Sequence, residues 1–256
     1  MMKRVRLFGL DFASGSMDQT VQEVIDLITL RRARVITPVN VDITVRLLRE
    51  PVDEELRAAC RESDLIVPDG MPLVWASQLL GTPLAYRVTG LDLMVALCAR
   101  AAQTERSVFL LGAAPGVAQR AAAALLTLYP RLRIAGTCAP PMGFERSPIE
   151  NARVLEAASM HSPDLLFVAF GVPKQEKWIR RWRTELSAGA ILSVGGSFDM
   201  LAGDRRRAPL WMQNHGFEWL WRMALEPARL WRRYLVDDVA FARYLWREWR
   251  KGRKPS

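Results

Sequence analysis

Residues 163–179 read PDLLFVAFGVPKQEKWI, and they contain the pattern that predicts the fold class. The apolar run Leu165–Phe170 is continuous rather than alternating, which is typical of a strand buried on both faces of a parallel sheet. Gly171 and Pro173 then mark a turn, and a helical pattern over Lys174–Leu186 follows. A buried strand that leads through a short turn into a helix is the repeating unit of an α/β fold.

The same unit recurs along the chain. We expect the other strands at Val5–Leu10, Arg34–Thr37, Leu65–Val67, Val108–Leu111, Arg133–Gly136 and Ile191–Val194, with helices between them such as Met17–Leu30, Val41–Arg49, Val117–Leu128 and Ile149–Met160. This alternation predicts a parallel sheet with helices on both faces. From Ala208 onward the strand patterns stop, and Pro209 and Pro227 punctuate two or three predicted helices.

Charge and aromatic residues are concentrated at the C-terminal end. The 256 residues carry a formal net charge of +9, of which residues 205–256 account for +8. The same segment holds six of the nine tryptophans: Trp211, Trp219, Trp221, Trp231, Trp246 and Trp249. We therefore expect a near-neutral body over residues 1–204 and a basic, aromatic, helical appendage over residues 205–256 that associates with a membrane.

The last predicted helix is amphipathic. On a helical wheel one face carries Trp231, Tyr234, Phe241, Leu245 and Trp249, and the opposite face carries Arg232, Arg243, Arg247 and Arg250. Such a helix can lie in the surface of an anionic bilayer, or it can dock its aromatic face on the body. The charge of the whole appendage favours the membrane, because each Lys or Arg near an anionic leaflet contributes about 1 kcal/mol.

Composition excludes several classes of protein. Half of the residues are hydrophobic and a quarter are charged, which is globular rather than disordered. Three widely spaced cysteines and two separate histidines argue for reduced thiols and against a structural zinc site. No apolar run approaches the ~20 residues of a membrane span, and the N-terminus does not resemble a signal peptide. We expect a cytoplasmic protein, peripheral at the inner face of the plasma membrane.

Polar and glycine-rich residues follow the predicted strands. They occur in the segments 37–42, 68–72, 111–116, 170–176 and 195–199. Ligands of open α/β sheets bind at the carboxyl ends of the strands. The turns Gly112–Gly116 and Gly195–Ser197 suit a phosphate group, because glycine lets the backbone approach an anion at a helix N-terminus. A purely structural role for these glycines is the alternative.

Two charged residues stand out as candidates for chemistry. Asp69 follows a buried strand and precedes Gly70, where a carboxylate can act as a general base, or cap the helix before Pro72. Arg87 can hold a pyrophosphate through its guanidinium group, or form a surface ion pair. No Asp-x-Asp pair follows an apolar strand, so a metal site is not indicated.

Seven segments in order resemble the WecG/TagA/CpsF family of bacterial glycosyltransferases. They read TPVNVD, LIVPDGMPLVW, YRVTGLDLM, VFLLGAAPGVA, YPRLRIAGTCAPPMGFE, PDLLFVAFGVPKQEKWI and SVGGSFDMLAGDRRRAPLWMQNHGFEWLWRMALEPARLWRRYL. The resemblance implies a Rossmann-like core and an inverting, metal-independent transfer that needs no cofactor. The donor would be a UDP-sugar of N-acetylmannosamine, uronic acid or glucose type. The acceptor would be a sugar on a polyprenyl pyrophosphate at the cytoplasmic membrane face.

The resemblance also assigns residues to roles. Asp69 matches the proposed base, and Gln175 matches a further polar group of the site. Contacts to the donor or to pyrophosphate are implied for Thr37, Asn40 and Arg87, and contacts to diphosphate for Arg222, Arg229 and Arg232 of the appendage. The predicted substrate-binding set also includes the strand-end residues Gly112, Gly171, Pro173, Lys174, Glu176, Gly195, Gly196 and Asp199.

Three other functions are compatible with parts of this pattern. Basic charge and aromatic residues suit a nucleic-acid-binding protein, although we expect no nucleic-acid partner. The fold class also suits a nucleotide-dependent oxidoreductase. A non-catalytic partner of a polysaccharide assembly is the third, and Asp69 argues against it. Formation of a homo-oligomer is left open.

Overall fold

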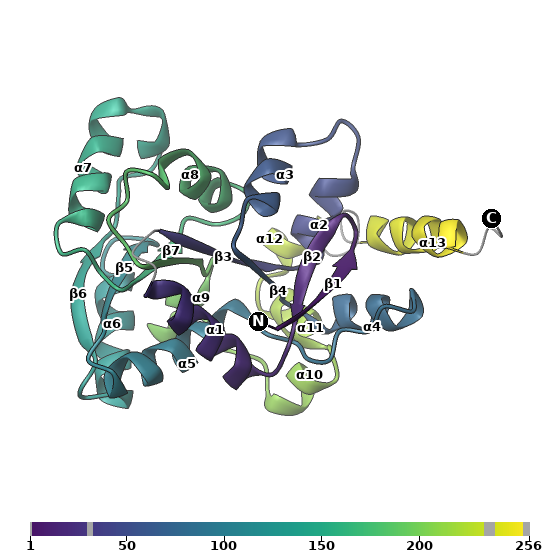
Figure 1. Cartoon of the computed structure of the whole chain (residues 1–256), viewed down its shortest axis with the longest axis horizontal. Helices are drawn as coiled ribbons and strands as arrows, with labels where there is room; N and C mark the ends of the chain where they lie inside the picture. Colours follow the sequence, from purple (N-terminus) through teal and green to yellow (C-terminus); the bar gives the residue numbers. More distant parts are fainter. Residues whose placement is uncertain (1, 30–32, 233–238, 253–256) are drawn as a thin grey trace.

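The computed structural model describes residues 2–29, 33–232 and 239–252 (Figure 1). Its centre is an eight-stranded sheet in the order β1-β2-β4-β3-β8-β7-β5-β6. The strands are β1 Lys3–Leu7, β2 Leu10–Ser14, β3 Arg34–Val39, β4 Leu65–Pro68, β5 Ser107–Gly112, β6 Arg133–Cys138, β7 Leu165–Ala169 and β8 Ala190–Ser193. All neighbouring strands are parallel except β1 and β2. The α/β, Rossmann-like fold class is confirmed.

The N-terminal prediction was wrong in one respect. The single strand expected over Val5–Leu10 is an antiparallel hairpin, in which Leu7 pairs with Leu10. Phe8 and Gly9 form the turn between the strands, and both have positive φ angles, of 49° and 79°. Two consecutive residues with positive φ are typical of the tight turn whose twist matches that of the flanking strands. The apolar run therefore reverses direction in its middle.

Helices cover both faces of the sheet, as the alternation of strands and helices predicts (Figure 1). Successive side chains of a strand point to opposite faces, so Leu165 and Phe167 of β7 join one core cluster while Leu166 and Val168 join another. The first cluster contains helices α1 (Met17–Ile28), α5 (Gly90–Gln103), α6 (Val117–Leu128) and α9 (Ser197–Leu201). The opposite face is covered by α2 (Val41–Leu48), α3 (Glu54–Arg61), α4 (Met71–Leu79), α7 (Pro148–Ser159) and α8 (Lys174–Trp182), and the 3₁₀ turn Phe144–Arg146 lies on the same side.

The described part of the appendage contains four helices rather than two or three. They are α10 (Leu210–Asn214), α11 (Glu218–Leu225), α12 (Pro227–Arg232) and α13 (Ala240–Gly252). Gly216 separates α10 from α11 with a φ of 72°, and Pro227 begins α12 directly after α11 ends at Leu225. The break at Pro227 agrees with the sequence pattern, and the break at Gly216 was not predicted.

Helix α13 docks on the body through part of its aromatic face. Phe241 is buried, and its ring lies edge-on to that of Phe8 with 5.5 Å between centroids. Tyr244 and Leu245 pack against the same cluster, so the docking alternative holds for this part of the helix. Trp246 instead stays half exposed beside Arg250. Two residues that were expected on the same helix are not part of α13 as described. Trp231 belongs to α12, and Tyr234 lies outside the described residues.

Two expectations from composition can be compared with the described residues. All three cysteines are unpaired, and two of them are buried. None of the helices in the described ranges combines the length and the hydropathy needed to cross a bilayer.

Candidate active site

A cleft of about 1050 Å³ opens at the carboxyl ends of β3, β4, β7 and β8. One wall is the body and the other is the appendage, from Arg205 to Leu230 and again at Val239 and Phe241. Nine of the predicted site residues line this cleft: Asn40, Asp69, Arg87, Gly171, Gln175, Gly195, Gly196, Asp199 and Arg222. The structure thus brings together residues that lie up to 182 positions apart in the sequence.

Five predicted residues do not line the cleft: Thr37, Gly112, Pro173, Lys174 and Glu176. Thr37 is buried within β3, where its hydroxyl pairs with that of Ser63 at 2.7 Å. At Gly112 a Cβ atom would approach the carbonyl oxygen of Ala169 to 2.6 Å, so this glycine permits close packing of β5 on β7. Their predicted substrate contacts therefore do not fit the cleft.

Pro173 and Lys174 begin α8 and lie behind the cleft wall. Pro173 takes the N-cap position of the helix. The ammonium group of Lys174 lies over the ring of Phe144, 5.6 Å from its centroid, and 3.6 Å from the carboxylate of Glu145. These contacts hold the start of α8 and do not point to a ligand.

The side-chain amide of Gln175 joins two glycine turns of the cleft. Gln175 is only 3% exposed, and its Oε1 accepts hydrogen bonds from the backbone N–H groups of Gly171 (3.1 Å) and Gly195 (3.2 Å). The N–H of Ser197 is also used internally, since it donates to the carbonyl of Val194. The expectation that these amides bind phosphate is therefore not met at Gly195 and Ser197, and Gln175 positions the turns.

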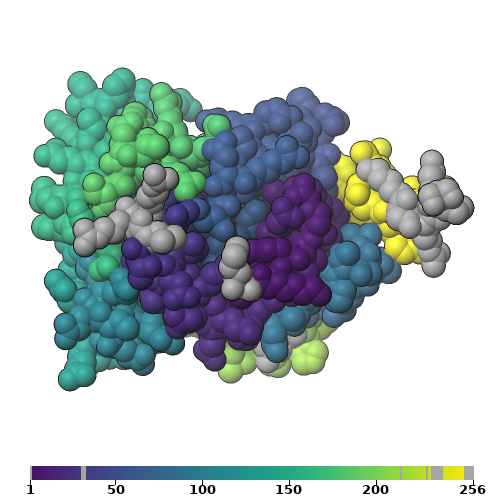
Figure 2. Space-filling model, in the orientation of Figure 1, coloured from purple at the N-terminus to yellow at the C-terminus, as the bar shows by residue number. Residues whose placement is uncertain are grey.

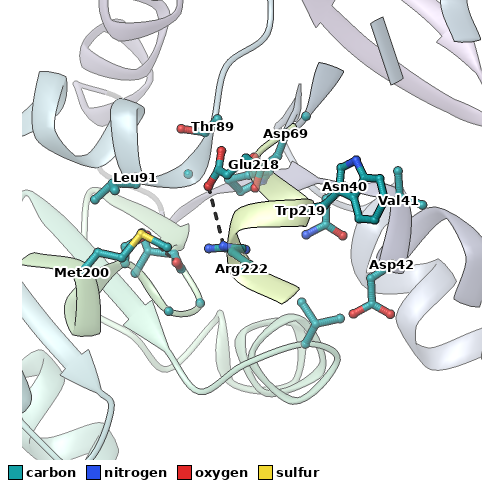
Figure 3. Close-up of a pocket in the computed structure, with 18 of the residues that line it drawn as sticks. Asn40, Val41, Asp42, Asp69, Thr89, Leu91, Met200, Glu218, Trp219 and Arg222 are labelled. Carbon is teal, nitrogen blue, oxygen red and sulfur yellow. Dashed lines mark hydrogen bonds and ion pairs between the residues drawn. The ribbon is translucent and has the colours of Figure 1, made fainter. Parts of the chain in front are cut away.

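Asp69 lines the cleft beside Glu218 (Figure 3). Its backbone N–H donates to the carbonyl of Val39, and Gly70, with a φ of 130°, makes the turn that follows. The alternative role as a cap of α4 does not hold, because Gly70 takes the N-cap position without a side-chain hydrogen bond. The Asp69 carboxylate instead accepts the N–H of Gly90, the first residue of α5. A helix N-terminus favours the charged form of such a group.

The surroundings of Asp69 have opposing effects on its protonation. Burial is the largest effect, and together with the negative charge of Glu218 it raises the pKa of Asp69 to about 6. The positive charges of Arg222 and Arg87 act in the opposite direction. A carboxyl group with a pKa near 6 is ionised at neutral pH and is a stronger base than an ordinary aspartate.

Arg87 takes part in ion pairs inside the cleft rather than on the outer surface. Its guanidinium group lies 3.7 Å from Asp92 and 3.5 Å from Glu218 of the appendage. Asp92 also pairs with Arg207 at 2.6 Å and accepts a hydrogen bond from the hydroxyl of Thr89. These contacts fasten the beginning of the appendage to the start of α5.

Asn40 and Asp42 occupy the other end of the cleft, on the side where Trp219 lies (Figure 3). The Asn40 side chain accepts the N–H of Ile43 and so caps α2, which leaves its amide nitrogen as the group with donor capacity. Asp42 is buried and pairs with Arg46 at 2.8 Å. Both residues owe their position to the first turn of α2.

The comparisons with known proteins agree with this architecture. Residues 5–255 match the sequence model described as the glycosyl transferase WecG/TagA/CpsF family. This chain belongs to that family. It is 32% identical over 227 residues to a protein of Bacillus spizizenii, which covers 88% of this chain and 84% of the relative. A protein of Staphylococcus aureus is 30% identical over 231 residues, or 90% of this chain and 87% of the relative.

Both relatives carry the name N-acetylglucosaminyldiphosphoundecaprenol N-acetyl-beta-D-mannosaminyltransferase. A protein of Bacillus subtilis with the same name is 32% identical over 201 residues, which are 78% of this chain and 75% of the relative. The predicted enzyme class is therefore confirmed, and the chain is a glycosyltransferase. This assignment replaces the nucleic-acid-binding and oxidoreductase alternatives.

Several cleft residues of this WecG/TagA/CpsF glycosyltransferase were not predicted from the sequence. Arg205, Arg206 and Arg207 line the cleft, and Arg205 lies 3.4 Å from Glu226 and 3.9 Å from Asp199. Their signal was the run Gly-Asp-Arg-Arg-Arg shortly after α9, which was interpreted only as tail charge. Glu218 had no signal, because an acidic residue in a basic segment follows no motif.

Two predictions fall on side chains outside the described part. Arg229 and Arg232 belong to α12, but the positions of their side chains are not described. Among the residues that are described, no group of three or more His, Cys, Asp or Glu side chains is arranged to hold a metal ion.

Glu176 is a buried carboxyl group behind the cleft of the glycosyltransferase. It is 3% exposed, and its Oε1 accepts a hydrogen bond of 2.7 Å from the amide of Gln175. Its Oε2 and the hydroxyl of Ser193 have no hydrogen-bond partner within the described residues. Burial raises the pKa of Glu176 to about 7, and the nearby Asp42 adds to this, although the hydrogen bond from Gln175 lowers it. The Glu176 carboxyl therefore supports Gln175 from the interior.

Glu176→Gln is expected to change how stability depends on pH. The pKa of Glu176 is higher in the folded than in the unfolded protein, so the folded state retains a proton that the unfolded state releases between about pH 4.5 and 7. Wild-type stability therefore falls as the pH rises through this window. The variant lacks this titration, and we expect it to melt about 3 °C or more above wild type at pH 8, with a smaller difference at pH 5. Equal melting temperatures at both pH values, measured by circular dichroism, would contradict the burial of an ionisable carboxyl here.

Proposed function

We propose that this glycosyltransferase moves an N-acetylmannosamine-type sugar from a UDP-sugar to a sugar on a polyprenyl diphosphate, with inversion and without a metal ion. The observation that carries the proposal is Asp69, a carboxylate of raised pKa in a cleft with arginines on two sides. The names of the relatives support the acceptor class, because each specifies an N-acetylglucosaminyl diphosphoundecaprenol acceptor. Uronic acid and glucose donors are the alternatives that a donor panel would separate.

Asp69 is the base in this proposal. Its carboxylate removes the proton from the attacking hydroxyl of the acceptor sugar, and that oxygen forms a bond to the anomeric carbon of the donor. The bond from the anomeric carbon to UDP breaks on the opposite face, and its electron pair leaves with the diphosphate. Such a displacement inverts the anomeric centre. Because the base must be ionised, the rate should rise with pH through about 6.

Arginines supply the charge that the leaving diphosphate requires. Arg87 comes from the body, whereas Arg205, Arg206, Arg207 and Arg222 come from the appendage, and all five line the cleft. Guanidinium groups bind phosphate oxygens in a forked geometry, so they stabilise the negative charge that develops on UDP. We propose that the diphosphate lies between these two walls.

The membrane surface is part of the proposed function. Apolar side chains on α4, α10 and α11 are more than one-third exposed: Trp75, Leu79, Leu210, Trp211, Leu220 and Leu225. Tryptophan and leucine side chains beside basic residues suit the interface of an anionic bilayer, where a polyprenyl-linked acceptor is held. We propose that the enzyme is peripheral at the inner face of the plasma membrane.

The division into a catalytic body over residues 1–204 and a membrane-associating appendage over residues 205–256 belongs to the same proposal. Contacts of Arg205 and Arg207 with Asp199 and Asp92 support a boundary at which the appendage begins to close the cleft. Formation of a homo-oligomer stays open, and sedimentation at several protein concentrations will measure it.

The direct test is a transfer reaction with a defined product. The enzyme is incubated with UDP-N-acetylmannosamine and a short-chain lipid diphosphate that carries N-acetylglucosamine. We expect UDP release that depends on the acceptor and a disaccharide whose new anomeric configuration is opposite to that of the donor, as measured by NMR coupling constants. Retained configuration would refute the inverting mechanism, and transfer from another UDP-sugar alone would correct the donor.

Transfer is expected to survive chelation. The sequence lacks an Asp-x-Asp pair after an apolar strand, and arginines line the cleft where a metal-dependent enzyme would hold its ion. We expect the turnover rate in EDTA to stay within about twofold of the untreated rate, whereas removal of one such arginine costs far more. Loss of activity in EDTA that Mg²⁺ or Mn²⁺ restores would show that the mechanism needs a metal.

A further inference from the structure

Glu218 is an acidic residue that joins the two cationic walls of the cleft. It is the first residue of α11, and its side chain is 23% exposed. One carboxylate oxygen lies 3.5 Å from Nη1 of Arg87. The other lies 3.7 Å from Nε of Arg222, and Figure 3 shows this second contact. A single carboxylate therefore faces one guanidinium group from the body and one from the appendage.

Asp69 is close to the same charges but does not pair with them. Within the described residues, no Lys or Arg nitrogen lies within 4 Å of its carboxylate, and its hydrogen bond comes from the N–H of Gly90. Arg87 and Arg222 are near enough to favour the ionised form of Asp69, yet both direct nitrogen atoms at Glu218. The two carboxylates thus compete for the same pair of cations.

This competition has a chemical consequence. An arginine in direct contact with an aspartate lowers its pKa by about 1 to 3 units, and the aspartate then becomes a weak base. Such a contact at Asp69 would oppose proton transfer from an acceptor hydroxyl. It would also occupy a guanidinium group that the diphosphate needs.

We propose that Glu218 is a positioning residue for the base: it holds the guanidinium groups of Arg87 and Arg222 away from Asp69 while it keeps both in the cleft. The inference rests on the proposed function of Asp69. It gives the appendage a second role besides its arginines, because Glu218 reaches Asp69 only where α11 is seated against the body. The carboxylate is a neighbour of the base and does not itself need to touch the substrate.

The charges that face Asp69 come from each element packed around it. Glu218 and Arg222 face it from α11, Arg87 faces it from the segment before α5, and the N–H of Gly90 faces it from α5 itself. The nearby Arg87 also contacts Asp92, which pairs with Arg207. Loss of the Glu218 charge is therefore expected to remove the carboxylate that competes with Asp69 for Arg87 and Arg222.

The first test is the pH dependence of kcat/KM in the full-length Glu218→Gln enzyme with the short-chain acceptor. We expect the acid limb to move about one unit toward lower pH, and kcat on its plateau to fall, because the base becomes weaker. Glu218→Asp keeps the charge and should restore most of the wild-type profile. Glu226→Gln is the matched control, since Glu226 pairs with Arg205 on the same wall and should leave the acid limb in place.

The second test does not depend on turnover. The side-chain carboxyls of aspartate are labelled with ¹³C, the Asp69 signal is assigned by its loss in Asp69→Asn, and its titration is followed by NMR in wild type and Glu218→Gln. We expect the midpoint to be near pH 6 in wild type and lower in the variant. Circular dichroism confirms folding, and Glu218→Ala serves as a second neutral variant.

An unchanged or raised Asp69 midpoint in a folded neutral variant would overturn the role of Glu218, whatever the enzyme transfers. Failure of the proposed function would appear in a different measurement, the turnover of Asp69→Asn. If Asp69→Asn keeps its turnover, Asp69 is not the base, while the NMR titration still reports whether Glu218 governs the charge of Asp69.

Discussion

Asp69→Asn is expected to reduce turnover by about 100-fold or more while the fold and the affinity for UDP persist. A general base contributes typically 10²–10⁴ to the rate, and asparagine cannot accept the proton of the acceptor hydroxyl at neutral pH. The substitution keeps the size of the side chain and an oxygen that can accept the N–H of Gly90. Acceptor-dependent release of UDP measures the turnover, and calorimetric titration with UDP measures the binding.

Asp204→Asn is the matched control for this experiment. Asp204 also borders the cleft, but its carboxylate pairs with Arg120 of α6 and is partly exposed. We expect this variant to stay within about threefold of wild type. If Asp69→Asn behaves like Asp204→Asn, the assignment of the base is wrong.

Removal of residues 208–256 is expected to abolish transfer almost completely, even with a water-soluble acceptor. The truncation deletes most of one cleft wall, including Arg222, Glu218 and Trp219. It also removes Phe241 from the cluster around Phe8, so the melting temperature of the remaining body should fall. We expect at least a 100-fold loss of turnover, since the leaving diphosphate loses cationic partners.

Single substitutions separate the catalytic from the membrane role of the appendage. Arg222→Ala removes a guanidinium group from the cleft and should slow transfer to the soluble acceptor. Arg243→Ala and Arg250→Ala change exposed residues of α13 and should weaken only binding to anionic liposomes. That binding should also decrease with salt, because the Debye length falls from ~10 Å at 0.1 M to ~3 Å at 1 M. Equal losses of soluble-acceptor turnover in all three variants would show that the appendage is only an anchor.

Much of the sheet was predictable because strands buried on both faces of a parallel sheet have continuous apolar sequences. The run Leu165–Phe170 forms β7 almost to the residue. The N-terminal run was misinterpreted because the positive φ angles at Phe8 and Gly9 reverse the chain. A turn of this kind depends on two residues, and an aromatic residue in the first position gives little local signal.

The cleft residues that directly follow a strand were predictable from the sequence. Asp69 and Gly195 lie in it because their strands end at the same edge of the sheet. The prediction for Thr37 did not fit the cleft, because its side chain points to Ser63. The next residue, Pro38, lines the cleft instead. Glu218 enters the site only because the appendage packs on the body, and a tertiary contact of this kind leaves no periodic trace in the sequence.

The appendage is fastened near both of its ends. Arg207 pairs with Asp92 where the appendage leaves the body, and Phe241, which also lines the cleft, packs on Phe8. The described helices between these two contacts, α10, α11 and α12, form one wall of the cleft. We expect a wall that is held at two points to restrict the routes by which the UDP of the proposed reaction departs. Phe8→Ala removes the ring against which Phe241 packs, so we expect it to alter the rate of UDP dissociation without altering the charged groups of the cleft.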